Sequence, residues 1–269
     1  MAGEKKIFKD QMGYDVTVSW PPKRIVSLVP SQTELLAYLG LDEEVVGITK
    51  FCIHPEEWFT NKRRIGGTKN IDFNKIEELK PDLIIGNKEE NKEEQIKELM
   101  QRYPVWMSDI HNLDDAFDMI LNVGKLVNKY DKTAALVKDI RSNFKSLHNH
   151  EIPSTKTAYF IWREPYMSVG RSAFINSMME KLSLNNIFTG MPGEYPSVSA
   201  EQIKLANPEL ILLSSEPYPF AEKHIAEFKA ICPNAKVMLV DGEYFSWYGS
   251  RLLNAPMYFN TFLNEVSNA

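Results

Sequence analysis

One pattern occurs twice in the sequence and constrains the fold more than any other feature. Residues 76–85 (Ile-Glu-Glu-Leu-Lys-Pro-Asp-Leu-Ile-Ile) match residues 203–212 (Ile-Lys-Leu-Ala-Asn-Pro-Glu-Leu-Ile-Leu). In both copies a proline stops a helix, and an apolar run typical of a buried strand follows. A second pair, Val105–Asp109 and Val237–Asp241, lies at a similar offset. We interpret the chain as two equivalent lobes, the alternative being chance similarity between βα units.

Short β-branched runs alternate with helical runs in each lobe. This alternation predicts an α/β fold with two Rossmann-like lobes and mostly parallel sheets covered by helices. The expected strands are residues 24–29, 45–49, 82–86, 105–108, 157–162, 209–213 and 236–240. The first expected helix begins with a capping box at Ser31 and ends before Gly40. Further helices are expected to begin at Asp72, 93, Ser172, Ser199, 220 and 250.

The segment between the lobes has helical spacing of its apolar residues. Residues 114–150 contain no proline, and their pattern predicts a helix pair broken near residues 129–131. We therefore expect an N-terminal lobe at 1–113, a helical connector at 114–150 and a C-terminal lobe at 151–269. A long rigid helix transmits torsion poorly, which predicts limited lobe closure.

Composition excludes several classes of partner. Thirty-six acidic residues against 31 basic ones give a net charge of -5 without a basic block, so we expect no nucleic acid partner. No apolar run approaches the roughly 20 residues of a membrane span. Residues 1–20 lack the apolar core of a signal peptide. The chain is therefore either cytoplasmic, with Met1 as the native start, or lacks a trimmed leader.

The cysteines and the missing catalytic motifs narrow the chemistry. Cys52 and Cys232 are far apart, which excludes a disulfide framework and a cysteine-only zinc site. Two buried thiols are favoured over one long-range disulfide. Cys52 and His54 would supply only two metal ligands, so we expect no metal site. The chain has no nucleophile elbow, zincin motif, P-loop or dinucleotide fingerprint. We therefore expect no enzyme.

Aromatic and polar residues follow the expected strands, where open α/β sheets bind ligands. Such residues suit a large, flat, partly apolar ligand that carries carboxylates or amides. We expect aromatic rings to pack on its plane and Arg163 and Arg251 to meet its edge. Packing beside the C-terminal helix is the alternative role of the residues at 245, 247 and 248. The expected ligand contacts are Ser31, Gln32, Phe51, His54, Lys88, Trp162, Arg163, Tyr166, Phe245, Trp247, Tyr248 and Arg251.

Several segments together resemble a known family. Residues 24–36 (Arg-Ile-Val-Ser-Leu-Val-Pro-Ser-Gln-Thr-Glu-Leu-Leu), 45–48 and 79–85 are similar to the first lobe of class III periplasmic substrate-binding proteins. Residues 198–203 and 207–211 fit the second lobe. This is the helical-backbone metal-receptor family, which includes the vitamin B12-binding and ferric-siderophore-binding proteins of ABC importers. The resemblance covers about residues 8–265, nearly the whole chain.

The resemblance implies a monomer that captures a metal chelate in a cleft between its lobes for an ABC permease, without a cofactor of its own. A corrinoid is slightly favoured over a ferric siderophore or haem. Family members dock on the permease with one glutamate per lobe. Glu201 fits the second-lobe position, whereas Asn74 stands at the first. The implied location is the periplasm or cell surface. The alternative is a cytoplasmic chelate carrier, sensor or partner-binding module without a transporter.

Overall fold

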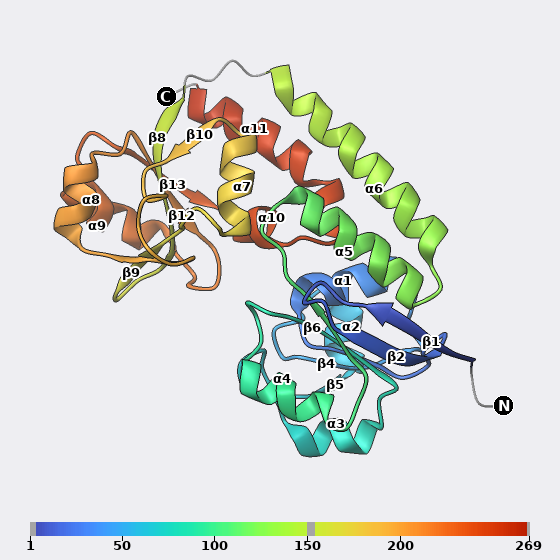
Figure 1. The fold of residues 1–269 in the computed structure, drawn as a ribbon. Coiled ribbons are helices and arrows are strands. Elements are labelled where there is room, and N and C mark those ends of the chain that lie inside the picture. Colours follow the sequence, from blue (N-terminus) through green and yellow to red (C-terminus); the bar gives the residue numbers. More distant parts are fainter. Residues whose placement is uncertain (1–3, 150–153, 268–269) are drawn as a thin grey trace. The chain divides into compact units, whose positions relative to one another are not determined.

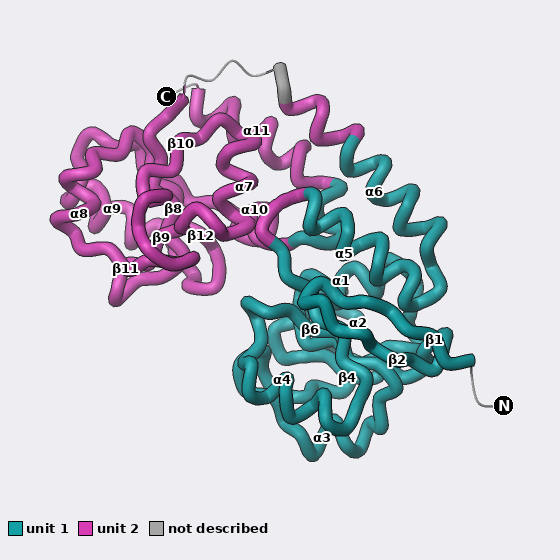
Figure 2. The backbone as a smooth tube through the Cα atoms, in the orientation of Figure 1, with its two compact units in different colours: residues 1–110, 114–141, 248–253 teal, residues 111–113, 142–247, 254–269 magenta. Residues whose placement is uncertain are grey.

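The computed structural model describes residues 4–149 and 154–267 (Figure 1). The chain divides into two compact units (Figure 2). Unit 1 comprises residues 1–110, 114–141 and 248–253, and unit 2 comprises residues 111–113, 142–247 and 254–269. A short segment late in the sequence is therefore part of the unit built mainly from the first half of the chain.

Within residues 4–149, the main sheet of unit 1 has five parallel strands in the order β5-β4-β3-β6-β7. The chain builds outward from β3 in both directions, so the carboxyl ends of β3 and β6 flank the point where strand order reverses. The strands are β3 (Ile25–Ser27), β4 (Val45–Ile48), β5 (Arg63–Arg64), β6 (Leu83–Asn87) and β7 (Val105–Ser108).

Helices and a separate hairpin complete unit 1. The antiparallel hairpin consists of β1 (Glu4–Lys9) and β2 (Asp15–Trp20). In Figure 1, α3 and α4 lie against the sheet of this unit. The helices are α1 (Pro30–Tyr38), α2 (Glu56–Asn61), α3 (Phe73–Leu79), α4 (Glu93–Met100) and α5 (Leu113–Leu126). A longer helix, α6 (Tyr130–Lys145), has residues in both units.

In the described part of residues 154–267, the sheet of unit 2 has the order β11-β9-β8-β12-β13, with β10 also paired to β8. The pairs of β8 with β10 and β12, and of β12 with β13, are parallel, whereas β9 pairs antiparallel with β8 and β11. The strands are β8 (Thr155–Trp162), β9 (Tyr166–Ser168), β10 (Leu184–Asn186), β11 (Ser197–Val198), β12 (Leu210–Ser214) and β13 (Lys236–Val240).

The helices of unit 2 cover an aromatic core. Phe160 lies at its centre, with ring centroids 4.8 Å from Phe228 and 6.3 Å from Phe188. The α-helices are α7 (Phe174–Lys181), α8 (Ala200–Ala206), α9 (Glu222–Ile231), α10 (Gly242–Ser246) and α11 (Ala255–Ser267). Two 3-10 turns, η1 (Ser146–Asn149) and η2 (Ser250–Leu253), precede β8 and α11.

Three expected helix starts differ in the structure. Ser31 does not cap α1, because Pro30 already occupies the first turn, where its fixed φ suits a helix. Ser172 does not cap α7, which begins after Ala173. The expected helix from residue 250 is divided into η2 and α11. The expected break in the helix pair is confirmed, since α5 ends at Leu126 and α6 begins at Tyr130.

Candidate functional site

The loop after β4 gives unit 1 an exposed aromatic side chain. Phe51 is 50% exposed, and the Lys50 ammonium lies 5.0 Å from its ring centroid. A Cβ atom on Gly67 would lie 3.1 Å from the ring, so glycine gives the ring room on this side. Ile53 is also exposed and His54 partly so. Phe51 and Ile53 thus expose apolar surface on the loop that follows β4.

Beneath this loop lies a buried polar cluster. The Thr33 hydroxyl donates to Ser27 Oγ at 2.8 Å and lies 3.1 Å from Cys52 Sγ, and Thr49 Oγ1 lies 3.1 Å from the same sulfur. Burial raises the pKa of the Cys52 thiol, so it stays protonated at neutral pH. Cys52 and Cys232 are both free and buried, which confirms the preference for two separate thiols.

Gln32 and Lys88 flank the point where strand order reverses in unit 1. Gln32 is 1% exposed, and its Nε2 donates to Ser108 Oγ at 2.5 Å. Among the described residues no partner reaches Gln32 Oε1. The Lys88 ammonium is exposed and pairs with Asp109 at 2.6 Å. Ser31 is buried against the returning segment, since a Cβ atom on Gly249 would lie 2.6 Å from its carbonyl oxygen.

Unit 2 carries an aromatic pair, one member exposed and one half-buried, at the carboxyl ends of two neighbouring strands. Trp162 ends β8 and is 40% exposed. Tyr218 follows β12, and its ring meets the Trp162 ring edge-on at 5.7 Å. Tyr218 was absent from the expected contacts, although it lies in a segment that directly follows a strand. The signal that could have found it is that β12 and β8 are neighbouring parallel strands, so the segments that follow them lie close together.

Arg163 and Tyr166 both form hydrogen bonds with a glutamate of α9. The Arg163 Nε donates to both Glu227 oxygens, at 3.2 and 2.8 Å, and the Tyr166 hydroxyl donates to Oε1. Burial raises the pKa of Glu227, but the hydrogen bonds from Tyr166 and Arg163 outweigh it and lower the pKa overall. In the structure, the Arg163 guanidinium therefore binds α9 and does not stand open to the edge of a ligand.

Arg251 is likewise paired inside its unit. Its Nη2 and Nε donate to the two Glu34 oxygens at 2.6 and 3.3 Å. This pair fixes η2 to α1, because the two residues lie on those elements. Both arginines expected at the ligand's edge thus bind carboxylates of their own units.

The aromatic residues after β13 are buried, which contradicts their expected exposure. Asp241 caps α10 by accepting from the Glu243 N–H at 3.1 Å. The resulting helical turn directs Phe245 inward, where it is 0% exposed and its ring centroid lies 5.0 Å from that of Phe259. Trp247 is buried and donates from Nε1 to Glu216 at 2.8 Å. Tyr248 is buried too. The packing alternative describes these side chains.

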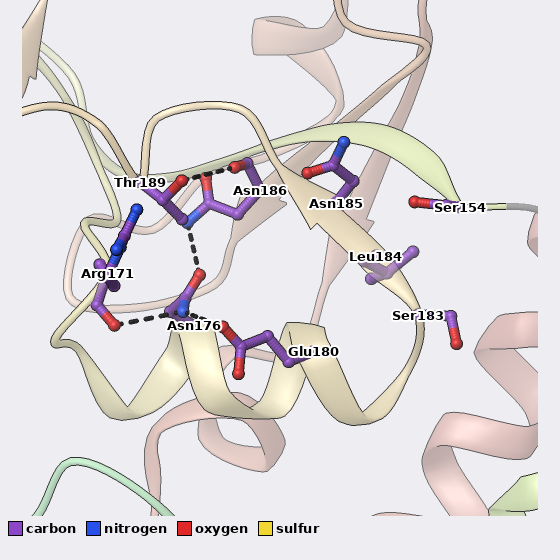
Figure 3. A pocket seen from close by; sticks show the side chains of 9 residues that line it. All are labelled: Ser154, Arg171, Asn176, Glu180, Ser183, Leu184, Asn185, Asn186 and Thr189. Atoms are coloured by element: carbon purple, nitrogen blue, oxygen red, sulfur yellow. Dashed lines mark hydrogen bonds between the residues drawn. The ribbon is translucent and has the colours of Figure 1, made fainter.

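A polar pocket of about 580 Å³ lies between α7 and β10 of unit 2 (Figure 3). At its floor the buried Asn176 donates to Glu180 at 2.9 Å and accepts from Asn186 at 2.9 Å. Asn186 also donates to the Val169 carbonyl. These bonds tie the turn before α7 to β10, which is a structural role. None of the twelve expected ligand contacts lines this pocket.

The two expected docking positions occupy equivalent places. Glu201 lies in the first turn of α8 and Asn74 in the first turn of α3, and the side chain at each position is exposed. Within the described residues, no group of three or more His, Cys, Asp or Glu side chains is arranged to hold a metal ion.

Comparison with known proteins assigns the family. A family model described as "Periplasmic binding protein" matches residues 25–230. The chain belongs to the periplasmic binding protein family. A curated relative of this binding protein is an uncharacterized ABC transporter substrate-binding lipoprotein, YvrC, of Bacillus subtilis (strain 168). It is 28% identical over 213 residues, which are 76% of this chain and 67% of the relative.

Solved structures show the same fold over nearly the whole binding protein. The vitamin B12-binding protein BtuF of Vibrio cholerae superposes with a TM-score of 0.78 at 22% identity, covering 93% of this chain and 99% of that one. The haem-binding protein RhuT of Roseiflexus sp. RS-1 gives a TM-score of 0.76 at 19% identity, covering 90% and 99%. In the described ranges of this binding protein, no helix combines the length and apolar character needed to cross a bilayer.

Proposed function

We propose that this binding protein captures a metal chelate for an ABC importer and performs no chemistry on it. A corrinoid is favoured over haem or a ferric siderophore. Membership of the family supports a binding role, and the relative named as an ABC transporter substrate-binding lipoprotein supports delivery to an importer. The observation that carries the proposal is that each unit exposes a flat aromatic side chain at the carboxyl end of its sheet.

The exposed rings of Phe51 and Trp162, which we call the aromatic faces, support recognition of a large planar ligand. Phe51 and Trp162 are 50% and 40% exposed, although burying such rings is favourable by about 25 cal/mol per Å² of apolar surface. Large aromatic side chains left partly in water at strand ends are suited to covering a ligand's apolar plane. The remaining expected contacts on exposed loops, His54 and Lys88, lie in unit 1.

The state of the two arginines favours a corrinoid. Haem and many ferric siderophores present anionic groups, which are best bound by bidentate arginine. Arg163 and Arg251 already pair with Glu227 and Glu34. Breaking such a pair to bind an anion leaves a glutamate without its partner, which is costly. The amide-bearing rim of a corrinoid needs hydrogen bonds but no free arginine.

A titration of the purified protein tests the ligand class. Cyanocobalamin, haemin and a ferric hydroxamate siderophore are added separately, and tryptophan fluorescence and visible absorbance are followed. We expect saturable quenching with the tightest Kd for cyanocobalamin. Tightest binding of haemin or the siderophore would reject the corrinoid preference, and no binding of all three would reject the chelate proposal.

Two variants and a matched control locate the ligand. Phe51→Ala and Trp162→Ala should each weaken binding by about 1–3 kcal/mol, the cost of losing a buried aromatic contact. Tyr130→Ala removes a comparably exposed aromatic side chain from α6 and should leave the Kd unchanged. Equal effects of all three variants would show that the aromatic faces are not the site.

We also propose that Glu201 contacts the permease. Its exposed carboxylate in the first turn of α8 suits pairing with a basic partner surface. Glu201→Ala should reduce uptake of labelled ligand by cells while leaving the Kd of the isolated protein unchanged. Asn74→Ala should change neither quantity. Normal uptake by the Glu201 variant would contradict the docking role.

A further inference from the structure

Tyr218 is held between an exposed ring and a buried histidine. Its ring meets Trp162 at 5.7 Å on one side, and contacts Phe220 at 4.8 Å and His224 at 5.4 Å elsewhere. The ring is therefore fixed by its own unit, next to the exposed Trp162 ring. Tyr218 itself is only half-buried.

The backbone of α9 determines which nitrogen of His224 carries the hydrogen. The Ala221 N–H donates to Nδ1 at 2.9 Å, so Nδ1 is an acceptor without a hydrogen. In a neutral imidazole the other nitrogen is then the donor. Nε2 lies 3.2 Å from the Tyr218 hydroxyl oxygen, and the histidine is buried. His224 therefore donates to Tyr218, and Tyr218 cannot donate back.

The Tyr218 hydroxyl keeps one hydrogen that His224 cannot accept, because Nε2 of His224 is itself the donor in this pair. A phenol oxygen accepts from such donors through its lone pairs and has one hydrogen to give. With His224 as the donor, that hydrogen is available to an acceptor other than the His224 ring.

We propose that Tyr218 donates its hydroxyl hydrogen to an acceptor oxygen of the bound ligand, and that His224 is the positioning residue that enforces this direction. The inference rests on the proposed function, because it places a ligand on the Trp162 face. The ligand group is an amide carbonyl or carboxylate oxygen at the edge of a planar apolar surface. Tyr218 would thereby discriminate against flat ligands without an acceptor at this position.

Two variants separate hydrogen bonding from folding. Tyr218→Phe keeps the ring and removes the hydroxyl, so the Kd should rise about 2- to 13-fold, the range expected for one hydrogen bond. His224→Glu keeps the cap of α9, because a glutamate or glutamine at this position accepts from the N-cap N–H, as Gln202 does from the Ser199 N–H at 2.7 Å in α8. A carboxylate cannot donate and accepts the Tyr218 hydrogen instead, so the Kd should rise as in Tyr218→Phe while thermal unfolding stays cooperative.

The double variant tests whether the two residues act as one unit. If His224 acts through the hydroxyl, His224→Glu/Tyr218→Phe should bind no more weakly than Tyr218→Phe alone. Additive losses would overturn the positioning role. Cyanocobalamin supplies amide acceptors and haemin supplies carboxylates, so the probe whose affinity falls in Tyr218→Phe identifies the acceptor. Tyr130→Phe is the control and should bind as the parent does.

Nitrogen NMR of the ligand-free protein gives a readout that does not depend on the ligand. The His224 ring should show the Nε2-protonated tautomer, and an Nδ1-protonated ring would overturn the inference. If the parent binds a chelate and Tyr218→Phe binds it equally well, the inference fails and the proposed function stands. If the parent binds none of the probes, the proposed function fails and this inference falls with it.

Discussion

Helices α3 and α8 are built alike in the two units but present different surfaces. Asp72 caps α3 by accepting from the Lys75 N–H, and Ser199 caps α8 by accepting from the Gln202 N–H. Each helix ends at a residue with positive φ, 45° at Lys80 and 48° at Asn207. These shared features explain why the two segments adopt the same local structure.

The acid after each proline also has the same role. Asp82 accepts from the Lys23 and Arg24 N–H groups, each at 2.8 Å, and Glu209 accepts from the Lys156 N–H at 2.8 Å. In both units this carboxylate joins the strand that follows the helix to the start of the neighbouring strand. The positions that agree between the two segments, the helix caps and the acid after each proline, are therefore those that stabilise the local structure.

Two of the positions that differ between the copies are exposed to water. Glu78 of α3 corresponds to Leu205 of α8, which is 84% exposed, and Asn74 corresponds to Glu201. Exposed substitutions cost little stability, so the fold constrains these sites weakly. The two units therefore share helix caps and strand contacts, while the exposed positions of α3 and α8 differ.

The largest expected effect contrasts the aromatic residues of the two units. Phe245→Ala should destabilise unit 2 by about 3–5 kcal/mol, because it leaves a cavity in a packed aromatic core. Phe51→Ala should change the free energy of unfolding by less than about 0.5 kcal/mol, as expected of an exposed site. Urea unfolding measures both. Similar losses would show that Phe51 is also a core residue.

Two glutamates of unit 2 should respond oppositely to pH. The pKa of Glu227 is lowered by Tyr166 and Arg163 against a burial effect that raises it. Its stabilisation is therefore present above its ordinary pKa of 4.5 and is lost as pH falls through the folded value. Glu227→Gln should cost about 1–2 kcal/mol at pH 7, because hydrogen bonds to a charged group are lost, and less in acid.

The pH dependence of stability that comes from Glu216 has the opposite sign. Burial raises its pKa, which the hydrogen bonds from Ser246 and Trp247 only partly offset. The folded state then becomes less stable as pH rises from 4.5 through the raised value. Glu216→Gln should stabilise the protein at pH 7 by on the order of 1 kcal/mol, with no gain below pH 4.5. Unfolding free energies across pH 3–8 check both variants, and slopes of the same sign would contradict the assignment.

The two helix caps should be worth nearly the same. Asp72→Ala and Ser199→Ala should each destabilise by about 1 kcal/mol, because each removes the acceptor of an otherwise unpaired backbone N–H. Hydrogen exchange of the Lys75 and Gln202 amides measures the loss locally. A cost at only one helix would break the equivalence of the two copies.

The smallest expected effect concerns the helix ends. Lys80→Gly should stabilise by up to about 1 kcal/mol, because glycine adopts positive φ without the steric cost of a side chain. Asn207→Gly should gain less, since asparagine tolerates this conformation. Thermal unfolding measures the difference. A larger gain at Asn207 would reverse the expected order.

Local sequence signals predicted the fold well. Val105–Ser108 and Lys236–Val240 are strands with the expected bounds, and the Ser199–Gln202 capping box is present. These features depend on neighbours within a few residues. Ser31 failed as a cap for an equally local reason, since the preceding proline begins the helix first.

The candidate site was harder to predict, because its state depends on distant residues. Glu34 pairs with Arg251, 217 residues away, and Glu227 pairs with Arg163, 64 residues away. No local pattern shows that these arginines are already bound. Phe245 was expected in an open loop, but the Asp241 cap creates a helical turn that buries it. Trp162 is 40% exposed, as a ligand contact requires, and its neighbour Tyr218 was not among the expected contacts.

The segment 248–253 has a consequence for synthesis on the ribosome. It supplies η2 and the Arg251 partner of Glu34, and it belongs to unit 1 although more than 100 residues of unit 2 are made before it. Domains generally fold as units during synthesis from the N-terminus. Unit 1 cannot reach its final set of contacts until residues 248–253 have left the exit tunnel. A nascent chain released before residue 248 should therefore carry an incomplete first unit, with Glu34 lacking its arginine.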